Sequence, residues 1–204
     1  MTPVIRTLYV TWQDSESRAI YPVGRLQARA EFPEFEFGYL QGALDASGFK
    51  PFLAFPDLET VYRSRKLFPF FTNRMMPIKR PDYVEHVSRL GFEPGAVEPL
   101  EVLARSGGRG ATDRIELFAP PVADPSSGLF TYHFLARGVR HIGGAEEQIA
   151  RLRVGDELQL KKEPHNPADP SAVLVLHGVG RIGYVPHYLV EDVNAALDEA
   201  ESLD

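Results

Sequence analysis

The chain of 204 residues contains no cysteine, so disulfide bonds and thiolate chemistry are both excluded. It also has no apolar run of about 18 or more residues, the length that a membrane-spanning helix needs. The first residues, Met-Thr-Pro-Val-Ile-Arg, lack the charged start and apolar core of a secretory signal. These absences predict a globular protein located in the cytoplasm.

An excess of positive charge is also missing, since the formal net charge is −6. Residues 191–204 hold six acidic residues and no Lys or Arg, which accounts for the whole negative excess. Residues 129–190 hold seven Lys and Arg against six Asp and Glu, together with five of the six histidines. Such a near-neutral segment makes few phosphate contacts, so it suits weak recognition of a nucleic-acid end better than coating of a long strand.

A stiff turn is predicted at residues 163–170, Glu-Pro-His-Asn-Pro-Ala-Asp-Pro. Its prolines exclude a strand or helix interior, because proline fixes φ and removes a backbone donor. Expected strands at residues 156–162 and 173–176 flank the turn. The polar side chains of the turn either form a binding site or only hydrogen-bond their own backbone.

Four separated blocks around this turn resemble the HIRAN domain over residues 130–192. The blocks are Phe-Leu-Ala-Arg-Gly-Val-Arg-His-Ile-Gly at 134–143, Val-Gly-Asp-Glu-Leu at 154–158, the turn and its following Ser-Ala-Val at 163–173, and Ile-Gly-Tyr-Val-Pro at 182–186. The resemblance implies a small OB-like or SH3-like antiparallel β-barrel. It also implies the module that lets DNA-remodelling translocases grip the 3′ end of single-stranded DNA.

The first half of the chain is expected to form a small mixed module of strands and short helices. Strands are expected at 8–12, 18–26 and 115–118, an edge strand with a turn at 49–56, and helices at 81–90 and 99–108. Residues 35–40 are expected to form either a third strand or the entry to a short helix that runs through Leu44. Val-Gly-Arg-Leu at 23–26, Phe-Gly-Tyr-Leu at 37–40 and Phe-Phe-Thr-Asn-Arg-Met-Met-Pro at 70–77 give residues 5–120 a looser similarity to the N-terminal subdomain of HipA-type kinases. That family's ATP loop and catalytic aspartate are not found, so this resemblance implies a module that regulates a separate kinase.

A proline-rich and then small polar segment separates the two halves. The predicted fold class is α+β, with an N-terminal β/helix module at 1–120, a linker at 121–128 and a HIRAN-like β-barrel at 129–204 that ends in a helix. The first barrel strand is expected at 129–139, and a short helix with Ile149 facing inwards at 144–152.

The resemblance implies a nucleic-acid-binding site on side chains from three of the blocks. The predicted residues are Arg140, His141, Asn166, Asp169, Tyr184 and His187. In this set Asp169 would accept a hydrogen bond from a terminal 3′-hydroxyl, and Tyr184 would offer a stacking face. The alternative is that Tyr184 is a barrel-rim residue, Arg140 a salt-bridge partner and Asp169 a turn cap.

Two positions depart from the family. DNA-gripping members often carry tyrosine where this chain has His141 and Ala168. Stacking on an aromatic side chain stabilises each bound base by about 1–3 kcal/mol. The loss of two such platforms would weaken DNA binding or redirect the site to another ligand.

Enzyme motifs are not found, so we expect no catalytic residues and no cofactor. A metal-dependent hydrolase is the rival hypothesis, because Asp169 and five histidines could bind zinc or manganese: His133, His141, His165, His177 and His187. However, no His-x-x-x-His or His-x-Glu spacing occurs, and the glycine-rich segment 107–113 lacks the Walker spacing.

The sequence therefore favours a non-catalytic DNA-binding protein whose HIRAN-like module recognises single-stranded DNA or a 3′ DNA end, in DNA repair or genome defence. Expected partners are DNA and a kinase or helicase-type protein, and no membrane. The alternative is a protein-interaction regulator of a separate HipA-type kinase, in a toxin–antitoxin-like pair, with the barrel only structural.

Overall fold

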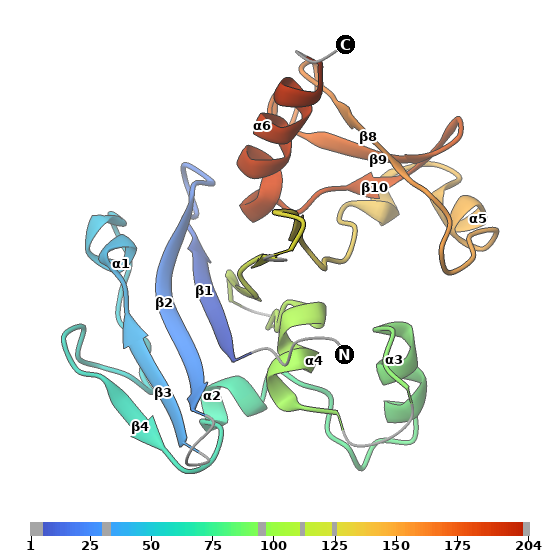
Figure 1. Cartoon of the computed structure of the whole chain (residues 1–204). Coiled ribbons are helices and arrows are strands. Elements are labelled where there is room, and N and C mark those ends of the chain that lie inside the picture. Colours follow the sequence, from blue (N-terminus) through green and yellow to red (C-terminus); the bar gives the residue numbers. More distant parts are fainter. Residues whose placement is uncertain (1–5, 30–33, 94–96, 111–112, 124–125, 202–204) are drawn as a thin grey trace. The chain divides into compact units, whose positions relative to one another are not determined.

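The computed structural model describes residues 6–29, 34–93, 97–110, 113–123 and 126–201 (Figure 1). The chain divides into two compact units, Met1–His133 and Phe134–Asp204, called below the N-terminal unit and the C-terminal unit. Each unit combines an antiparallel sheet with helices, and the chain ends in a helix. The predicted α+β class is therefore confirmed.

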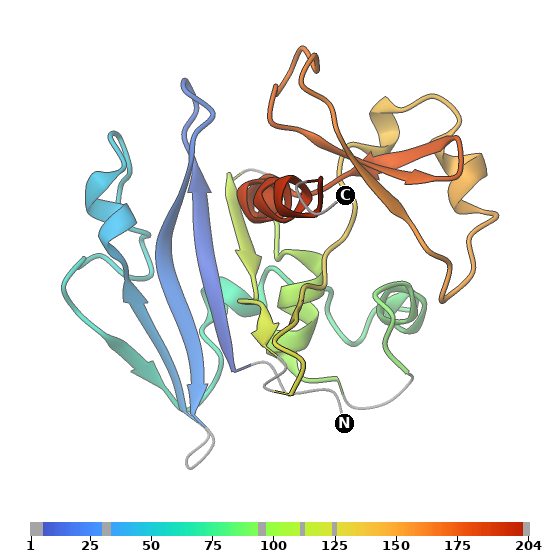
Figure 2. The same ribbon diagram turned by 45° about the horizontal axis from the view of Figure 1, so that its top comes forward.

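The N-terminal unit is built on a five-stranded antiparallel sheet with the strand order β4–β3–β2–β1–β5 (Figure 2). Asp14 sets the first turn, because its carboxylate accepts hydrogen bonds from the backbone N–H groups of Glu16 and Ser17. Four of its strands lie where strands were expected: β1 (Thr7–Gln13), β2 (Ile20–Arg29), β3 (Glu34–Tyr39) and β5 (Ile115–Phe118). The remaining strand, β4 (Tyr62–Ser64), was not predicted.

Short helices accompany this sheet, and most of them contribute buried residues to its core cluster. They are α1 (Gln41–Asp45), α2 (Pro69–Thr72), α3 (Tyr83–Arg89) and α4 (Pro99–Ser106). Phe71 of α2 and Leu103 of α4 are completely buried in the same cluster as Phe37 of β3. Helix α4 ends at Gly107, whose φ of 76° is the left-handed conformation that favours glycine at the end of a helix.

Residues 49–56 do not form the edge strand that their apolar character suggests; the edge of the sheet is β4. Instead, the Tyr39 hydroxyl accepts a hydrogen bond from the Phe52 N–H at 2.7 Å and donates one to the Phe55 carbonyl at 2.8 Å. Burial raises the pKa of Tyr39 to about 12, so the hydroxyl keeps the proton that it donates. A side chain thus satisfies backbone groups that a neighbouring strand would otherwise satisfy.

Helix α3 buries only one of its sides. Val87 is buried, whereas Val84 is 63% exposed. The helix spans seven residues and continues its buried side with Leu90 just beyond its end, so Val84 is left on the solvent side. In the described ranges, no helix is long and apolar enough to cross a membrane.

The C-terminal unit is built on a three-stranded antiparallel sheet with the order β10–β9–β8. Helix α6 packs on β9, and α5 packs against β10 (Figure 1). The elements are the 3₁₀ helix η1 (Val139–His141), α5 (Ala145–Ile149), β8 (Gln159–Lys162), β9 (Val173–His177), β10 (Gly180–Tyr184), the 3₁₀ helix η2 (His187–Leu189) and α6 (Val190–Glu201). Val173, Val175 and Ile182 supply the buried face of the sheet.

The expected first barrel strand at 129–139 is wrong. Within it, β7 (Phe130–Thr131) pairs only with β6 (Val122–Ala123), and Arg137 forms an isolated bridge to Tyr184. Gly138 follows with a φ of 67°, which turns the chain into η1 and prevents a longer ladder. The paired strands of the described residues therefore form an open three-stranded sheet in this unit.

Two further details adjust the sequence-based picture. Ala145 is the buried residue of α5, whereas Ile149 is 38% exposed and does not face inwards as expected. The predicted linker at 121–128 includes β6. In the sequence, the boundary between the two compact units falls between His133 and Phe134.

Candidate functional site

The turn at residues 163–172 is held by its own side chains. Asn166 Oδ1 accepts hydrogen bonds from the N–H groups of Ala168 at 2.9 Å and Asp169 at 3.2 Å. Asp169 Oδ1 accepts hydrogen bonds from both the N–H and the hydroxyl of Ser171, at 2.9 and 2.5 Å. These contacts confirm that Asn166 and Asp169 cap their own turn, as the alternative interpretation held.

Asn166 also belongs to a polar network with Glu163, Tyr184 and Arg181. Its Nδ2 donates to Glu163 Oε2 at 2.7 Å and to the Tyr184 hydroxyl at 3.3 Å. The Tyr184 hydroxyl donates to Glu163 Oε2 at 2.9 Å and accepts a hydrogen bond from Arg181 at 3.1 Å, while Arg181 forms an ion pair with Glu163. Every polar atom of the Asn166 side chain is therefore engaged, so its role is to position the turn and Tyr184.

The charge state of this network follows from its contacts. The hydrogen bond from Asn166 lowers the pKa of Glu163, and the Tyr184 hydroxyl and Arg181 lower it further against the opposing effect of burial. Burial raises the pKa of Tyr184, as does its hydrogen bond to Glu163. At neutral pH the network therefore pairs an ionised carboxylate with a protonated phenol.

Close backbone contacts place the Tyr184 ring. The backbone of Arg137 exchanges two hydrogen bonds of 2.8 Å with that of Tyr184. A Cβ atom on Gly138 would lie 3.0 Å from the ring, and one on Gly183 would lie 2.9 Å from the Arg137 carbonyl oxygen. Glycine at these two positions lets the bridge and the ring approach each other.

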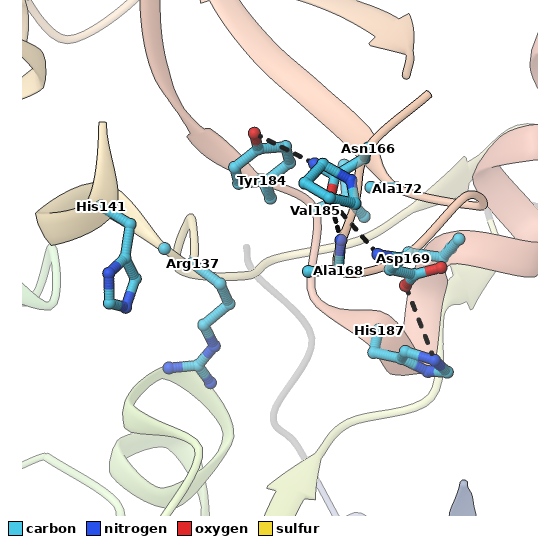
Figure 3. Close-up of a pocket in the computed structure, with 12 residues that line it drawn as sticks. Arg137, His141, Asn166, Ala168, Asp169, Ala172, Tyr184, Val185 and His187 are labelled. Atoms are coloured by element: carbon cyan, nitrogen blue, oxygen red, sulfur yellow. Dashed lines mark hydrogen bonds and ion pairs between the residues drawn. The ribbon is translucent and has the colours of Figure 1, made fainter. Parts of the chain in front are cut away.

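These elements surround one pocket of about 460 Å³, called below the end pocket (Figure 3). Its lining comes from η1, the turn, β10 and η2: Arg137, Gly138, His141, Asn166, Pro167, Ala168, Asp169, Ala172, Tyr184, Val185, His187 and Val190. This volume lies within the range of small-molecule sites, and a mostly apolar wall with a few convergent polar groups is typical of them.

Asp169 and His187 both line the end pocket and lie next to each other (Figure 3). Asp169 Oδ2 lies 3.8 Å from His187 Nε2, and the two side chains are 31% and 53% exposed. The Ser171 contacts use Oδ1, which leaves Oδ2 of Asp169, the oxygen next to His187, for other contacts. This oxygen can accept a hydrogen bond from a ligand hydroxyl.

The structure brings five of the six predicted site residues together around the end pocket: His141, Asn166, Asp169, Tyr184 and His187. Arg140 does not line it; its Nε lies 3.2 Å from His141 Nε2 on exposed η1. Arg137 lines the pocket instead. Arg137 and Arg140 both belong to the block at 134–143 that resembles the HIRAN domain. The pattern of the sequence did not show which arginine faces the pocket, because the left-handed turn at Gly138 lies between them.

The histidines do not gather into a metal site. Across the described residues, no group of three or more His, Cys, Asp or Glu side chains lies close enough together to hold a metal ion. The hypothesis of a metal-dependent hydrolase therefore has no structural support.

The network predicts a pH dependence of the turn. The pKa of Glu163 is lower in the folded chain than its ordinary value of 4.5. The ionised carboxylate therefore stabilises the fold at pH values above 4.5, and this stabilisation is lost as the pH falls through the lower pKa of the folded chain. In wild type, the hydrogen-exchange protection of the Asn166 and Ala172 amides should decrease between about pH 6 and about pH 3. Glu163→Gln should reduce that protection roughly tenfold at about pH 6 and flatten its pH dependence. Equal protection and equal pH profiles in both proteins would contradict this role.

Comparison with known proteins gives one match. Residues 129–203 match the family model of the HIRAN domain. No curated protein and no solved structure matches the chain. The resemblance to the HIRAN domain is thus confirmed for the region that contains the end pocket. The looser similarity of residues 5–120 to HipA-type kinases, and the kinase-regulator hypothesis built on it, receive no support.

Proposed function

We propose that the C-terminal unit is a non-catalytic DNA-binding module that holds the 3′ end of a single strand in the end pocket. The HIRAN match indicates DNA binding. The observation that supports recognition of an end is the convergence of His141, Asp169 and Tyr184, from three separate blocks, and of His187 on one pocket. A role in DNA repair or genome defence is the corresponding biological proposal.

The chemistry of the end pocket suits a terminal nucleotide. The Tyr184 ring offers a face on which a base can stack, and Val185 and Ala172 provide apolar walls for the sugar. Asp169 Oδ2 offers the acceptor for a 3′-hydroxyl, while His187 and Arg137 offer donors for a phosphate.

The same residues limit the strength of binding. Ala168 and His141 line the end pocket, so the two positions where family members often carry tyrosine do face the proposed ligand. Tyr184 is then the side chain that offers an aromatic face, so stacking involves about one base and contributes about 1–3 kcal/mol to binding. Selectivity for the end then depends on the hydroxyl contact to Asp169.

The decisive measurement compares short single strands that end in a 3′-hydroxyl or in a 3′-phosphate, by fluorescence anisotropy at low salt. Wild type should prefer the hydroxyl by about tenfold, because a phosphate places negative charge against the Asp169 carboxylate. Asp169→Asn should abolish this preference, because it keeps one side-chain oxygen for the Ser171 contacts and replaces the other with a donor.

Asp169→Ala is the companion variant, since it removes both the turn cap and the ligand acceptor. A preference that disappears in Asp169→Asn while the amide protection of Ala172 is unchanged would assign the effect to ligand recognition. Absence of binding by any oligonucleotide at low salt would refute the proposal.

A further inference from the structure

A second depression lies on the same sheet, outside the end pocket. It measures about 420 Å³, and none of its residues lines the end pocket: Lys161, Lys162, Glu163, Pro164, His165, Leu174, Leu176 and Arg181. The strand register explains its position, because Lys161 pairs with Leu174, and Leu176 pairs with Arg181. Residues opposite each other in an antiparallel pair point to the same face. We call this depression the sheet groove.

The sheet groove concentrates the positive charge of its region. Three of the seven Lys and Arg side chains in the segment 129–190 line it. His165 adds an imidazole to this lining. Lys162 forms an ion pair with Asp198, and Arg181 forms one with Glu163. Lys161 is exposed, and the described part of the chain offers it no ion-pair partner within 4.0 Å. The three cations outnumber Glu163, the carboxylate that lines the groove with them, so the groove keeps a net positive charge beside the apolar side chains of Leu174 and Leu176.

One polar network forms the wall between the two sites. Glu163 and Arg181 line the sheet groove, whereas Asn166 and Tyr184 line the end pocket. Hydrogen bonds to Glu163 and to the Tyr184 hydroxyl connect these four side chains. The strand register also links the two sites, because Leu174 of the sheet groove pairs with Lys161 on one side and with Tyr184 of the end pocket on the other. A groove of cations over an apolar floor matches a chain of phosphates joined by sugars.

We propose that the sheet groove binds the phosphodiester backbone of the strand whose end occupies the end pocket, with Lys161 as its principal phosphate contact. This inference rests on the proposed function and adds to it the path of the strand beyond its last nucleotide. It also explains how a unit with seven Lys and Arg against twelve Asp and Glu can bind DNA, since part of its positive charge is gathered where the backbone passes.

The test compares a thymidine trinucleotide, which reaches only the end pocket, with a thymidine decanucleotide, both ending in a 3′-hydroxyl. Wild type should bind the decanucleotide about tenfold more tightly, and Lys161→Glu should remove most of this difference while changing trinucleotide affinity less than about twofold. The slope of log affinity against log salt should fall by about 0.7 in this variant. Arg151→Glu is the matched control, because Arg151 is exposed in the same unit and lines neither site.

The outcomes separate this inference from the proposed function. If both oligonucleotides bind with equal affinity and Lys161→Glu changes neither, the groove path is overturned while the end pocket stands. If no oligonucleotide binds, both proposals fail, and amide shifts of Lys161 and His165 with inorganic tripolyphosphate would then assign the groove to a free phosphate compound. Tighter binding of an oligoglutamate peptide than of the decanucleotide would overturn the nucleic-acid assignment.

Discussion

Replacing Tyr184 with alanine is expected to weaken the binding of short single-stranded DNA by about 10- to 100-fold. The substitution removes the aromatic face of the end pocket and also the hydroxyl that bonds to Glu163, Asn166 and Arg181. Both losses act on the same site, because the network positions the turn that carries Asp169. Fluorescence anisotropy with a trinucleotide measures the effect without a contribution from the sheet groove.

Tyr184→Phe separates the two contributions. It keeps the ring and removes the hydroxyl, so the binding loss should shrink to about threefold to tenfold, while the amide protection of Asn166 falls. If the phenylalanine variant binds as weakly as the alanine variant, stacking is not the main contribution of Tyr184. If the alanine variant binds like wild type, the end pocket is not the DNA site.

Replacing Phe37 with alanine is expected to destabilise the N-terminal unit by about 3–5 kcal/mol. Phe37 is completely buried, and its ring centroid lies 4.2 Å from that of Phe55, 5.1 Å from Tyr39 and 5.7 Å from Phe71. A Cβ atom on Gly24 would lie 2.7 Å from the ring, so the ring fills the space over that glycine. The cavity left by alanine would therefore open at the centre of an aromatic cluster.

The chain has one tryptophan, Trp12, which packs against Phe49 and Tyr21 of this cluster. Its fluorescence in a denaturant titration therefore reports the unfolding of the N-terminal unit. Leu53→Ala is the control, since Leu53 is fully exposed in the same unit and its loss should cost less than about 0.5 kcal/mol. A cost below about 1 kcal/mol for Phe37→Ala would show that the cluster is not the core of the unit.

Local chemistry made much of this fold predictable. The first three strands follow from their β-branched and aromatic residues, the stop of α4 follows from Gly107, and the stiff turn follows from its prolines. Residues 49–56 were missed because a tyrosine hydroxyl from β3 satisfies their backbone, and a contact between distant residues leaves no periodic signal in the sequence.

The site was predictable in part, and by a different route. The family resemblance supplied His141, Asp169, Tyr184 and His187 as a set, but it gave no geometry. The polar network joins Glu163 to Tyr184 across the sheet, with a register shift between Arg181 and Gly183, and no spacing rule reports such a shift. The sheet groove likewise depends on which face of β8 carries Lys161, which the paired strands define.

The hydrogen bonds of Asn166 and Asp169 within their own turn have a consequence for the kinetics of binding. Because the turn is already fixed, the DNA end of the proposed complex would not have to order it, and little conformational entropy would be lost from the protein on association. Encounter is then limited by the orientation of the strand rather than by a loop closing over it, so differences in affinity among DNA ends should appear mainly in their dissociation rates.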